Sequence, residues 1–128
     1  MSDARFGCAI NCMDGRTQLP VIEWVKREYG VEYVDAVTEP GPVKMLAEAP
    51  EGSAALSIRE RVAISVEKHG SKTVAVVTHF DCAGNPVPKD AQLEQLAKAL
   101  VTVRDWGFDA EVVGVWVDEN WQVHRTGS

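Results

Sequence analysis

Short apolar runs alternate along the chain with segments whose apolar residues recur at helical spacing. This alternation predicts crossover units on a mostly parallel sheet. The runs predict strands over 5–11, 31–37, 73–78 and 111–117. A last strand over 121–125 follows a link too short for a parallel crossover, so we expect it to be antiparallel. The predicted fold class is therefore α/β, a mostly parallel central sheet of about five strands flanked by helices.

Helical spacing and capping residues predict three helices between these strands. The first runs over 19–29, with Pro20 in its first turn and Gly30 as a left-handed cap. The second begins at Ser57, where Glu60 completes a capping box, and ends at Gly70. The third begins at the capping residue Asp90 and ends at Gly107. Its predicted buried stripe comprises Leu93, Leu96, Ala97, Leu100 and Val103. The proline- and glycine-rich stretch 38–52 is predicted to be mostly loop, with one short helical turn over 43–49.

Composition narrows the class of protein. The length of 128 residues suits one domain over 1–128. The formal charge is −6 and there is no run of Lys or Arg, which argues against a nucleic-acid or anionic-membrane partner and favours a small-molecule substrate. The longest apolar stretch, 112–117, is too short to span a bilayer. Asp3 and Arg5 stand where a signal peptide needs apolar residues, so we expect a cytoplasmic protein.

Two clusters of polar residues carry candidate chemistry. They are Cys12-Met13-Asp14-Gly15-Arg16 and His79-Phe80-Asp81-Cys82. Each begins where a predicted parallel strand ends, and ligand sites in open α/β sheets gather at that edge. If the two strands are neighbours, Cys12, His79 and Cys82 meet. Two thiolates and one imidazole suit Zn²⁺ and leave a fourth tetrahedral position open, as in catalytic zinc sites.

The third cysteine needs another explanation. Cys8 shares strand parity with Cys12, but an extended backbone separates the two by roughly 13 Å, too far for one metal ion. We therefore predict that Cys8 is a small buried apolar residue.

The two motifs, C-x-D-x-R and H-x-x-C, in this order and at strand ends, resemble those of the β-class carbonic anhydrases. The resemblance covers most of the chain. It implies that Cys12, His79 and Cys82 bind zinc and that Asp14 and Arg16 form a catalytic pair beside it. It also implies a homodimer or larger homo-oligomer. The expected activity is zinc-dependent reversible hydration of CO₂ to bicarbonate and a proton, which would make the protein a lyase.

The spacing of Asp14 and Arg16 agrees with this role. Arginine can bind a carboxylate through two hydrogen bonds, which keeps the carboxylate ionised. In some members of the family the same aspartate instead binds zinc directly and closes the site, so both states remain open for Asp14. The alternative for the pair is an exposed ion pair in a surface turn.

Two other functions remain open. The same zinc site can act on a related linear substrate, carbonyl sulfide or carbon disulfide, or the chain can be a non-catalytic zinc- or anion-binding relative. The chain lacks the family's N-terminal helical extension and has a shortened segment after Cys82, which keeps the non-catalytic reading open. Gly15 also stands where the family usually has serine, and Ala83-Gly84 follows Cys82 where glycine usually comes at once.

The remaining polar and aromatic residues receive structural interpretations. His69 is interpreted as a cation at a helix C-terminus, and Asp81 as a brace for the second motif. The four tryptophans are interpreted as core or interface packing; they are Trp24, Trp106, Trp116 and Trp121.

Overall fold

The computed structural model describes residues 4–126. Asp3, which contributes to the expectation that the N-terminus is not a signal peptide, lies outside this range. Within the described range, no helix has both the length and the apolar character needed to cross a membrane.

In residues 4–126, five strands form one sheet in the order β2-β1-β3-β4-β5. The strands are β1 (Phe6–Cys12), β2 (Tyr33–Glu39), β3 (Thr73–His79), β4 (Glu111–Val117) and β5 (Val123–Thr126). The first four pair in parallel, and β5 pairs with β4 in antiparallel fashion. The predicted fold class is therefore confirmed.

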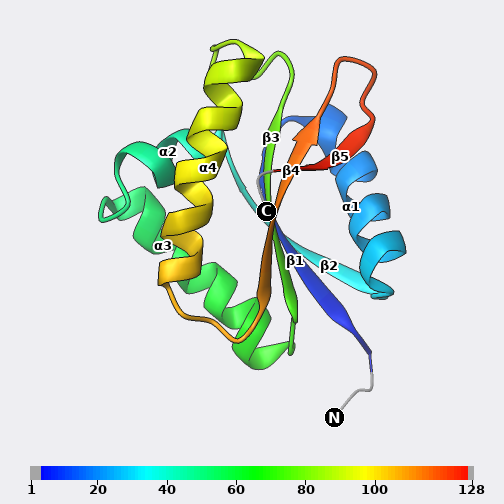
Figure 1. Ribbon diagram of the computed structural model, residues 1–128. Coiled ribbons are helices and arrows are strands. Elements are labelled where there is room, and N and C mark those ends of the chain that lie inside the picture. The colour runs from blue at the N-terminus through cyan, green and yellow to red at the C-terminus, as the bar shows by residue number, and fades with distance from the viewer. Residues whose placement is uncertain (1–3, 127–128) are drawn as a thin grey trace.

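Helices cover both faces of the sheet (Figure 1). The helix α1 (Gly15–Tyr29) covers one face. The other is covered by α2 (Pro42–Glu48), by α3 (Ser53–Ala63) with its π-helical continuation η1 (Ile64–Lys68), and by α4 (Lys89–Asp105). The core is divided accordingly. Ile10, Val74 and Val76 pack toward α2, α3 and α4, whereas Ala75, Val77 and Val115 pack toward α1.

The strand order contains a switch between β1 and β3. From β1 the chain crosses through α1 to β2 on one side, and it then returns past β1 through α2 and α3 to reach β3 on the other side. The loops that follow β1 and β3 therefore leave the sheet toward opposite faces. In open α/β sheets the crevice at such a point is where ligands bind.

Several details of the predicted elements are wrong. The second strand spans 33–39 and not 31–37. The third helix begins at Lys89 after Pro88, so Asp90 lies inside it and does not cap it. The first helix begins at Gly15, so Pro20 lies inside it and not in its first turn. Ser57 and Glu60 form no capping box, because α3 already begins at Ser53 after Gly52. In the predicted stripe of α4, Ala97 is exposed and Ala99 is buried in its place.

The last strand also begins two residues later than predicted. Trp121 has a φ of 60° and therefore belongs to the turn and not to β5. The predicted strand 111–117 and the left-handed cap at Gly30 are confirmed. Gly107, where the third helix was predicted to end, follows the C-cap Trp106 and has a φ of 77°.

Candidate metal centre

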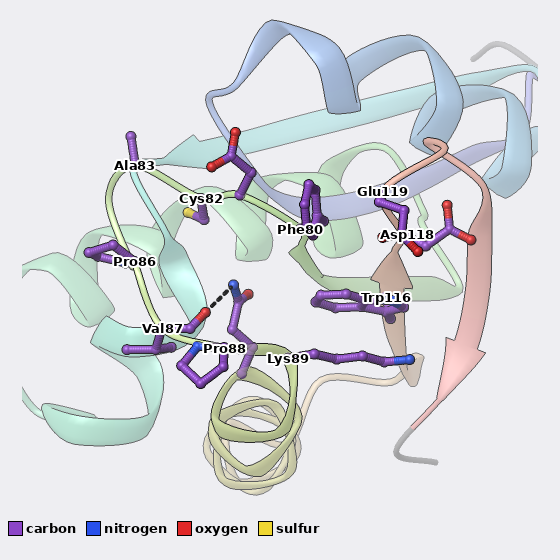
Figure 2. A pocket seen from close by; sticks show the side chains of 12 residues that line it. Phe80, Cys82, Ala83, Pro86, Val87, Pro88, Lys89, Trp116, Asp118 and Glu119 are labelled. Atoms are coloured by element: carbon purple, nitrogen blue, oxygen red, sulfur yellow. Dashed lines mark hydrogen bonds between the residues drawn. The ribbon is translucent and has the colours of Figure 1, made fainter.

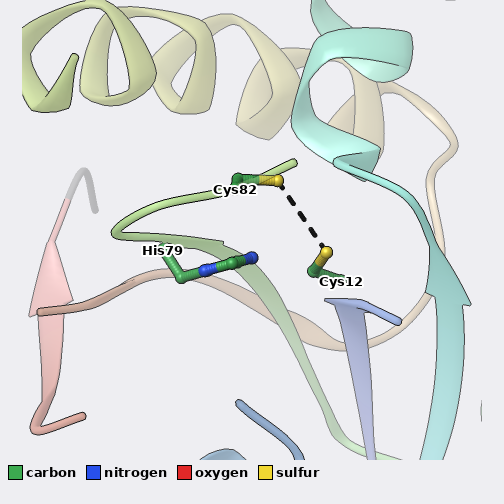
Figure 3. A group of neighbouring side chains, drawn as sticks. All are labelled: Cys12, His79 and Cys82. Carbon is green, nitrogen blue, oxygen red and sulfur yellow. Dashed lines mark hydrogen bonds between the residues drawn. The ribbon is translucent and has the colours of Figure 1, made fainter. Parts of the chain in front are cut away.

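The residues of the two motifs meet at the carboxyl edge of the sheet. Cys12 is the last residue of β1, His79 is the last residue of β3, and Cys82 follows three residues later. The two sulfur atoms and a ring nitrogen of His79 all lie within 4.8 Å of one another. Figure 3 shows the three side chains converging on one point. The predicted juxtaposition follows directly from the pairing of β1 with β3.

The three side chains are shielded from water. Cys12 and Cys82 are each 4% exposed and His79 is 1% exposed. A buried polar group without a partner costs free energy. The burial of His79 therefore requires that both of its ring nitrogens have something to bind.

One nitrogen of His79 lacks such a partner within the described residues. Its Nδ1 lies 2.7 Å from the carbonyl oxygen of Phe80. A carbonyl only accepts, so Nδ1 carries the proton and donates it, and Nε2 presents its lone pair. That Nε2 is buried and has no hydrogen-bond partner. A metal-ligating histidine usually has this arrangement, in which the second nitrogen donates to a carbonyl and fixes the ring.

The two sulfur atoms have a separation that suits a shared metal ion. They lie 3.8 Å apart. This is far beyond the disulfide bond length of about 2.05 Å. Two thiolates about 2.3 Å from one tetrahedral zinc ion would be separated by about 3.8 Å. The donor set therefore fits zinc in identity and in spacing.

The electrostatics of the site favour ionisation of one of the two thiols, that of Cys12. A hydrogen bond with Cys82 lowers the pKa of Cys12 to about 4, against the opposing effect of burial. The same hydrogen bond and burial raise the pKa of Cys82. Backbone N–H groups of Asp14 and Gly41 further lower the pKa of Cys12, and those of Gly84 and Asn85 act in the same direction on Cys82. These amides place positive partial charge next to sulfur.

A close backbone contact holds the loop that carries Cys82. A Cβ built on Gly84 would lie 2.6 Å from the carbonyl carbon of Pro40, and one on Gly41 would lie 2.8 Å from Cβ of Asn85. Gly41 also has a φ of 68°. Only glycine permits this approach, which brings the loop after β2 against the loop after β3. At Gly15, by contrast, an added Cβ meets nothing within 4 Å.

Asp14 and Arg16 form the pair that their spacing predicts. Nε of Arg16 lies 3.1 Å from Oδ1 of Asp14, and Nη2 lies 2.7 Å from Oδ2. Oδ1 also accepts from the backbone N–H of Arg16 at 2.9 Å, which caps α1. The hydrogen bonds from Arg16 lower the pKa of Asp14 to about 2. Asp14 is therefore an ionised carboxylate two residues after Cys12.

Arg16 has two further contacts that spacing does not indicate. Its guanidinium contacts Asp81 in the second motif and the ring of Trp121 after β4. Trp121 is thus more than a packing residue, and Asp81 contacts the first motif. Neither contact leaves a signal in the sequence, because each depends on how distant loops meet.

The other candidate residues lie away from this centre. Cys8 is fully buried in the core, as predicted, and burial raises its pKa to about 12. His69 caps the end of η1, where its Nδ1 lies 2.7 Å from Asp35 and its ring stacks on Phe6.

A cavity of about 580 Å³ lies beside the loop that follows β3. Phe80, Val87 and Trp116 contribute apolar walls, and Lys89 and Glu119 contribute charge. Figure 2 shows the loop on one side of this cavity and Trp116 with Lys89 on another. Cys82 belongs to the lining, so the cavity adjoins the candidate metal centre.

Comparison with known proteins decides the family. A family described as "Putative carbonic anhydrase" matches residues 2–127, nearly the whole chain. The chain belongs to this family. Sequence comparison with curated proteins gives no match.

Solved β-carbonic anhydrases share the fold of this family member. The chain is similar to isoform I from Trichomonas vaginalis, with a TM-score of 0.63, 11% identity, and coverage of 98% of this chain and 85% of that one. It is also similar to the tetrameric enzymes of Sordaria macrospora, with a TM-score of 0.59, 13% identity, and coverage of 100% of this chain and 83% of that one. CafA of Aspergillus fumigatus is similar with a TM-score of 0.53 and 15% identity, and the match covers 96% of this chain and 75% of that one. At these identities the likeness shows a shared fold.

The backbone contact at Gly84 yields a test by paired substitutions. Gly84→Ala must displace the loop that carries Cys82 and is expected to weaken Zn²⁺ binding at least about tenfold, the usual effect of disturbing the surroundings of metal ligands. Gly15→Ala, where there is room, is expected to leave binding unchanged and to raise the free energy of unfolding by about 0.5–1 kcal/mol. Competition with a zinc chelator and urea denaturation measure the two quantities. Equal zinc affinity in both variants would contradict the role assigned to this contact.

Proposed function

We propose that this protein is a zinc-dependent carbonic anhydrase that hydrates CO₂ reversibly to bicarbonate and a proton. The observation that carries the proposal is a buried, unpartnered Nε2 of His79 facing two thiols, with an ionised carboxylate two residues from one of them. Family membership and fold agree with it.

Cys12, His79 and Cys82 are the proposed zinc ligands. They supply three protein ligands, which is the number typical of catalytic zinc, whereas structural zinc sites usually have four. Cys8 cannot complete a closed site, because it lies four residues before Cys12 in the same strand and packs in the core. When bound, zinc supplies a Lewis acid that lowers the pKa of water toward about 7, so that hydroxide is available at neutral pH to attack the carbon of CO₂.

Asp14 is the proposed orienting group. Its carboxylate is ionised at neutral pH and can accept a hydrogen bond from the attacking water, which turns a lone pair toward CO₂. Arg16 holds this carboxylate through two parallel hydrogen bonds and keeps it from taking up the proton that hydration releases.

Charge balance at the site explains why the loop amides matter. Two thiolates cancel the formal charge of a zinc ion, which weakens its effect on water relative to an all-histidine site. Arg16 does not restore this charge, because it is paired with the carboxylates of Asp14 and Asp81. Backbone N–H groups directed at both sulfur atoms withdraw negative charge from them. The apolar walls of the adjoining cavity suit a small, linear, uncharged substrate such as CO₂.

Metal content tests the ligand assignment. Wild type is expected to bind one zinc per chain, whereas Cys12→Ser and His79→Ala are expected to lose most of it, because a buried site with two ligands cannot retain the ion. Cys8→Ala is the matched control and should keep full zinc. Elemental analysis after gel filtration measures the ratio. Full zinc in Cys12→Ser would contradict the assignment.

Stopped-flow CO₂ hydration at pH 7 and pH 8.5 tests the activity. Wild type is expected to be active, and Asp14→Asn is expected to keep its zinc while kcat/KM falls by about 10²–10⁴-fold, the range for loss of a group that handles the proton. Full zinc without hydration at either pH would contradict the proposal and favour a non-catalytic zinc protein. Turnover of carbonyl sulfide or carbon disulfide in its place would reassign the substrate.

We also propose that the protein forms a homodimer or larger homo-oligomer. Three large apolar side chains are exposed on the motifs and on α1: Met13 at 63%, Leu19 at 67% and Phe80 at 43%. The Sordaria macrospora enzymes of the same fold are tetrameric. Light scattering coupled to gel filtration is expected to give at least twice the chain mass of 14.0 kDa. Leu19→Glu should lower that mass, and a monomeric wild type would contradict the proposal.

A further inference from the structure

The guanidinium of Arg16 is held along two edges. The edge formed by Nε and Nη2 faces Asp14. The edge formed by Nη1 and Nη2 faces Asp81, whose Oδ2 accepts from Nη1 at 3.3 Å and whose backbone carbonyl accepts from Nη2 at 3.2 Å. The planar guanidinium has donors suited to two such pairs of bonds. Arg16 therefore links the loop after β1 to the loop after β3.

An aromatic ring covers one face of the same group. Cζ of Arg16 lies 4.5 Å from the centre of the Trp121 ring, within the range of cation–π attraction. The centre of that ring also lies 6.4 Å from the centre of the His79 ring. The Trp121 ring thus neighbours both a proposed zinc ligand and the cation that holds Asp14.

Both contacting residues have a positive φ, 58° at Asp81 and 60° at Trp121. Asp adopts this left-handed region more readily than most residues, but a bulky residue such as Trp rarely does. A tight turn holds Trp121 there, since its N–H donates to the carbonyl of Asp118 at 2.9 Å and the N–H of Asp118 donates to that of Gln122 at 3.0 Å. Such conformations are retained mainly where a functional site uses them.

We propose that Asp81 and Trp121 are positioning residues that fix Arg16 and, through it, the orientation of Asp14. The effect of these two residues on CO₂ hydration rests on the proposed function. Their restraint of Arg16 does not depend on it. Neither residue touches the reacting atoms in this proposal. Each acts by limiting the motion of the guanidinium.

The exposure of Arg16 and Asp81 to water explains why Arg16 needs more than one contact to hold it in place. The side chain of Arg16 is 47% exposed and that of Asp81 is 67% exposed. A single ion pair at this exposure is weakly restraining, because water and salt compete for both partners. Two carboxylates and an aromatic ring acting together hold the guanidinium along two edges and on one face. If Asp81 or Trp121 is removed, we expect Arg16 to turn away from Asp14 more often.

Nuclear magnetic resonance of the ¹⁵N-labelled, zinc-loaded protein measures this restraint directly. The side-chain Nε–H signal of Arg16 is assigned by its loss in Arg16→Lys. Asp81→Asn and Trp121→Leu are each expected to speed the hydrogen exchange of this signal about twofold to fivefold, the range for loss of one exposed ion pair or cation–π contact. Trp121→Phe keeps an aromatic face and should stay within about twofold of wild type. Asp109→Asn removes an exposed partner of Lys72 elsewhere and should have no effect.

Kinetics show whether the restraint matters for hydration. Asp81→Asn is expected to lower kcat/KM about threefold to tenfold with KM unchanged, and to have no further effect in an Asp14→Asn background, because it acts through Asp14. Unchanged Nε–H exchange in both Asp81→Asn and Trp121→Leu would overturn the proposal. Faster exchange with unchanged kcat/KM would overturn its catalytic part. A wild type that hydrates no CO₂ would contradict the proposed function, while the exchange measurement would still decide the restraint of Arg16.

Discussion

The parallel pairing of β1 with β3 is the constraint on which the rest of the site depends. Cys12 and His79 are the last residues of these two strands, so the pairing brings their side chains to one point of the sheet edge. Cys82 joins them because the loop after β3 turns back over this edge. The helices have a simpler part in this arrangement. They bury the two faces of the sheet and leave its carboxyl edge for chemistry.

Electrostatics at this edge result from backbone as much as from side chains. Pro40 and Gly41 pack directly against Gly84 and Asn85, and amides from both loops face the sulfur atoms. A site with two thiolates needs such donors, since its net charge otherwise leaves little positive potential for activating water. Gly41 and Gly84 have no side chain that takes part in the chemistry, but they allow the loops after β2 and β3 to approach each other closely.

The sequence predicted what local patterns encode. The β-branched run of β3, the apolar run of β4 and the motif spacing were enough for the sheet and for the meeting of Cys12, His79 and Cys82. Failures arose where two local signals competed. Ser57 and Glu60 have capping spacing, but the helix already begins at Ser53 and buries the apolar Ala55, two residues before Ser57.

Other features could not be predicted from local sequence patterns. The contacts of Arg16 with Asp81 and Trp121 join residues far apart in the chain, and the positive φ of Trp121 is imposed by its turn. The requirement for glycine at position 84 likewise depends on Pro40 lying opposite. Tertiary packing fixes such features, so spacing within one segment carries no trace of them.

X-ray absorption at the zinc edge of the purified protein identifies the atoms that bind the metal. We expect two sulfur ligands at about 2.3 Å and two lighter ligands, with scattering from one imidazole, at about 2.0–2.1 Å. In Cys12→Ser any residual zinc should have one sulfur ligand. Four sulfur ligands, or a first shell without sulfur, would contradict the proposed centre.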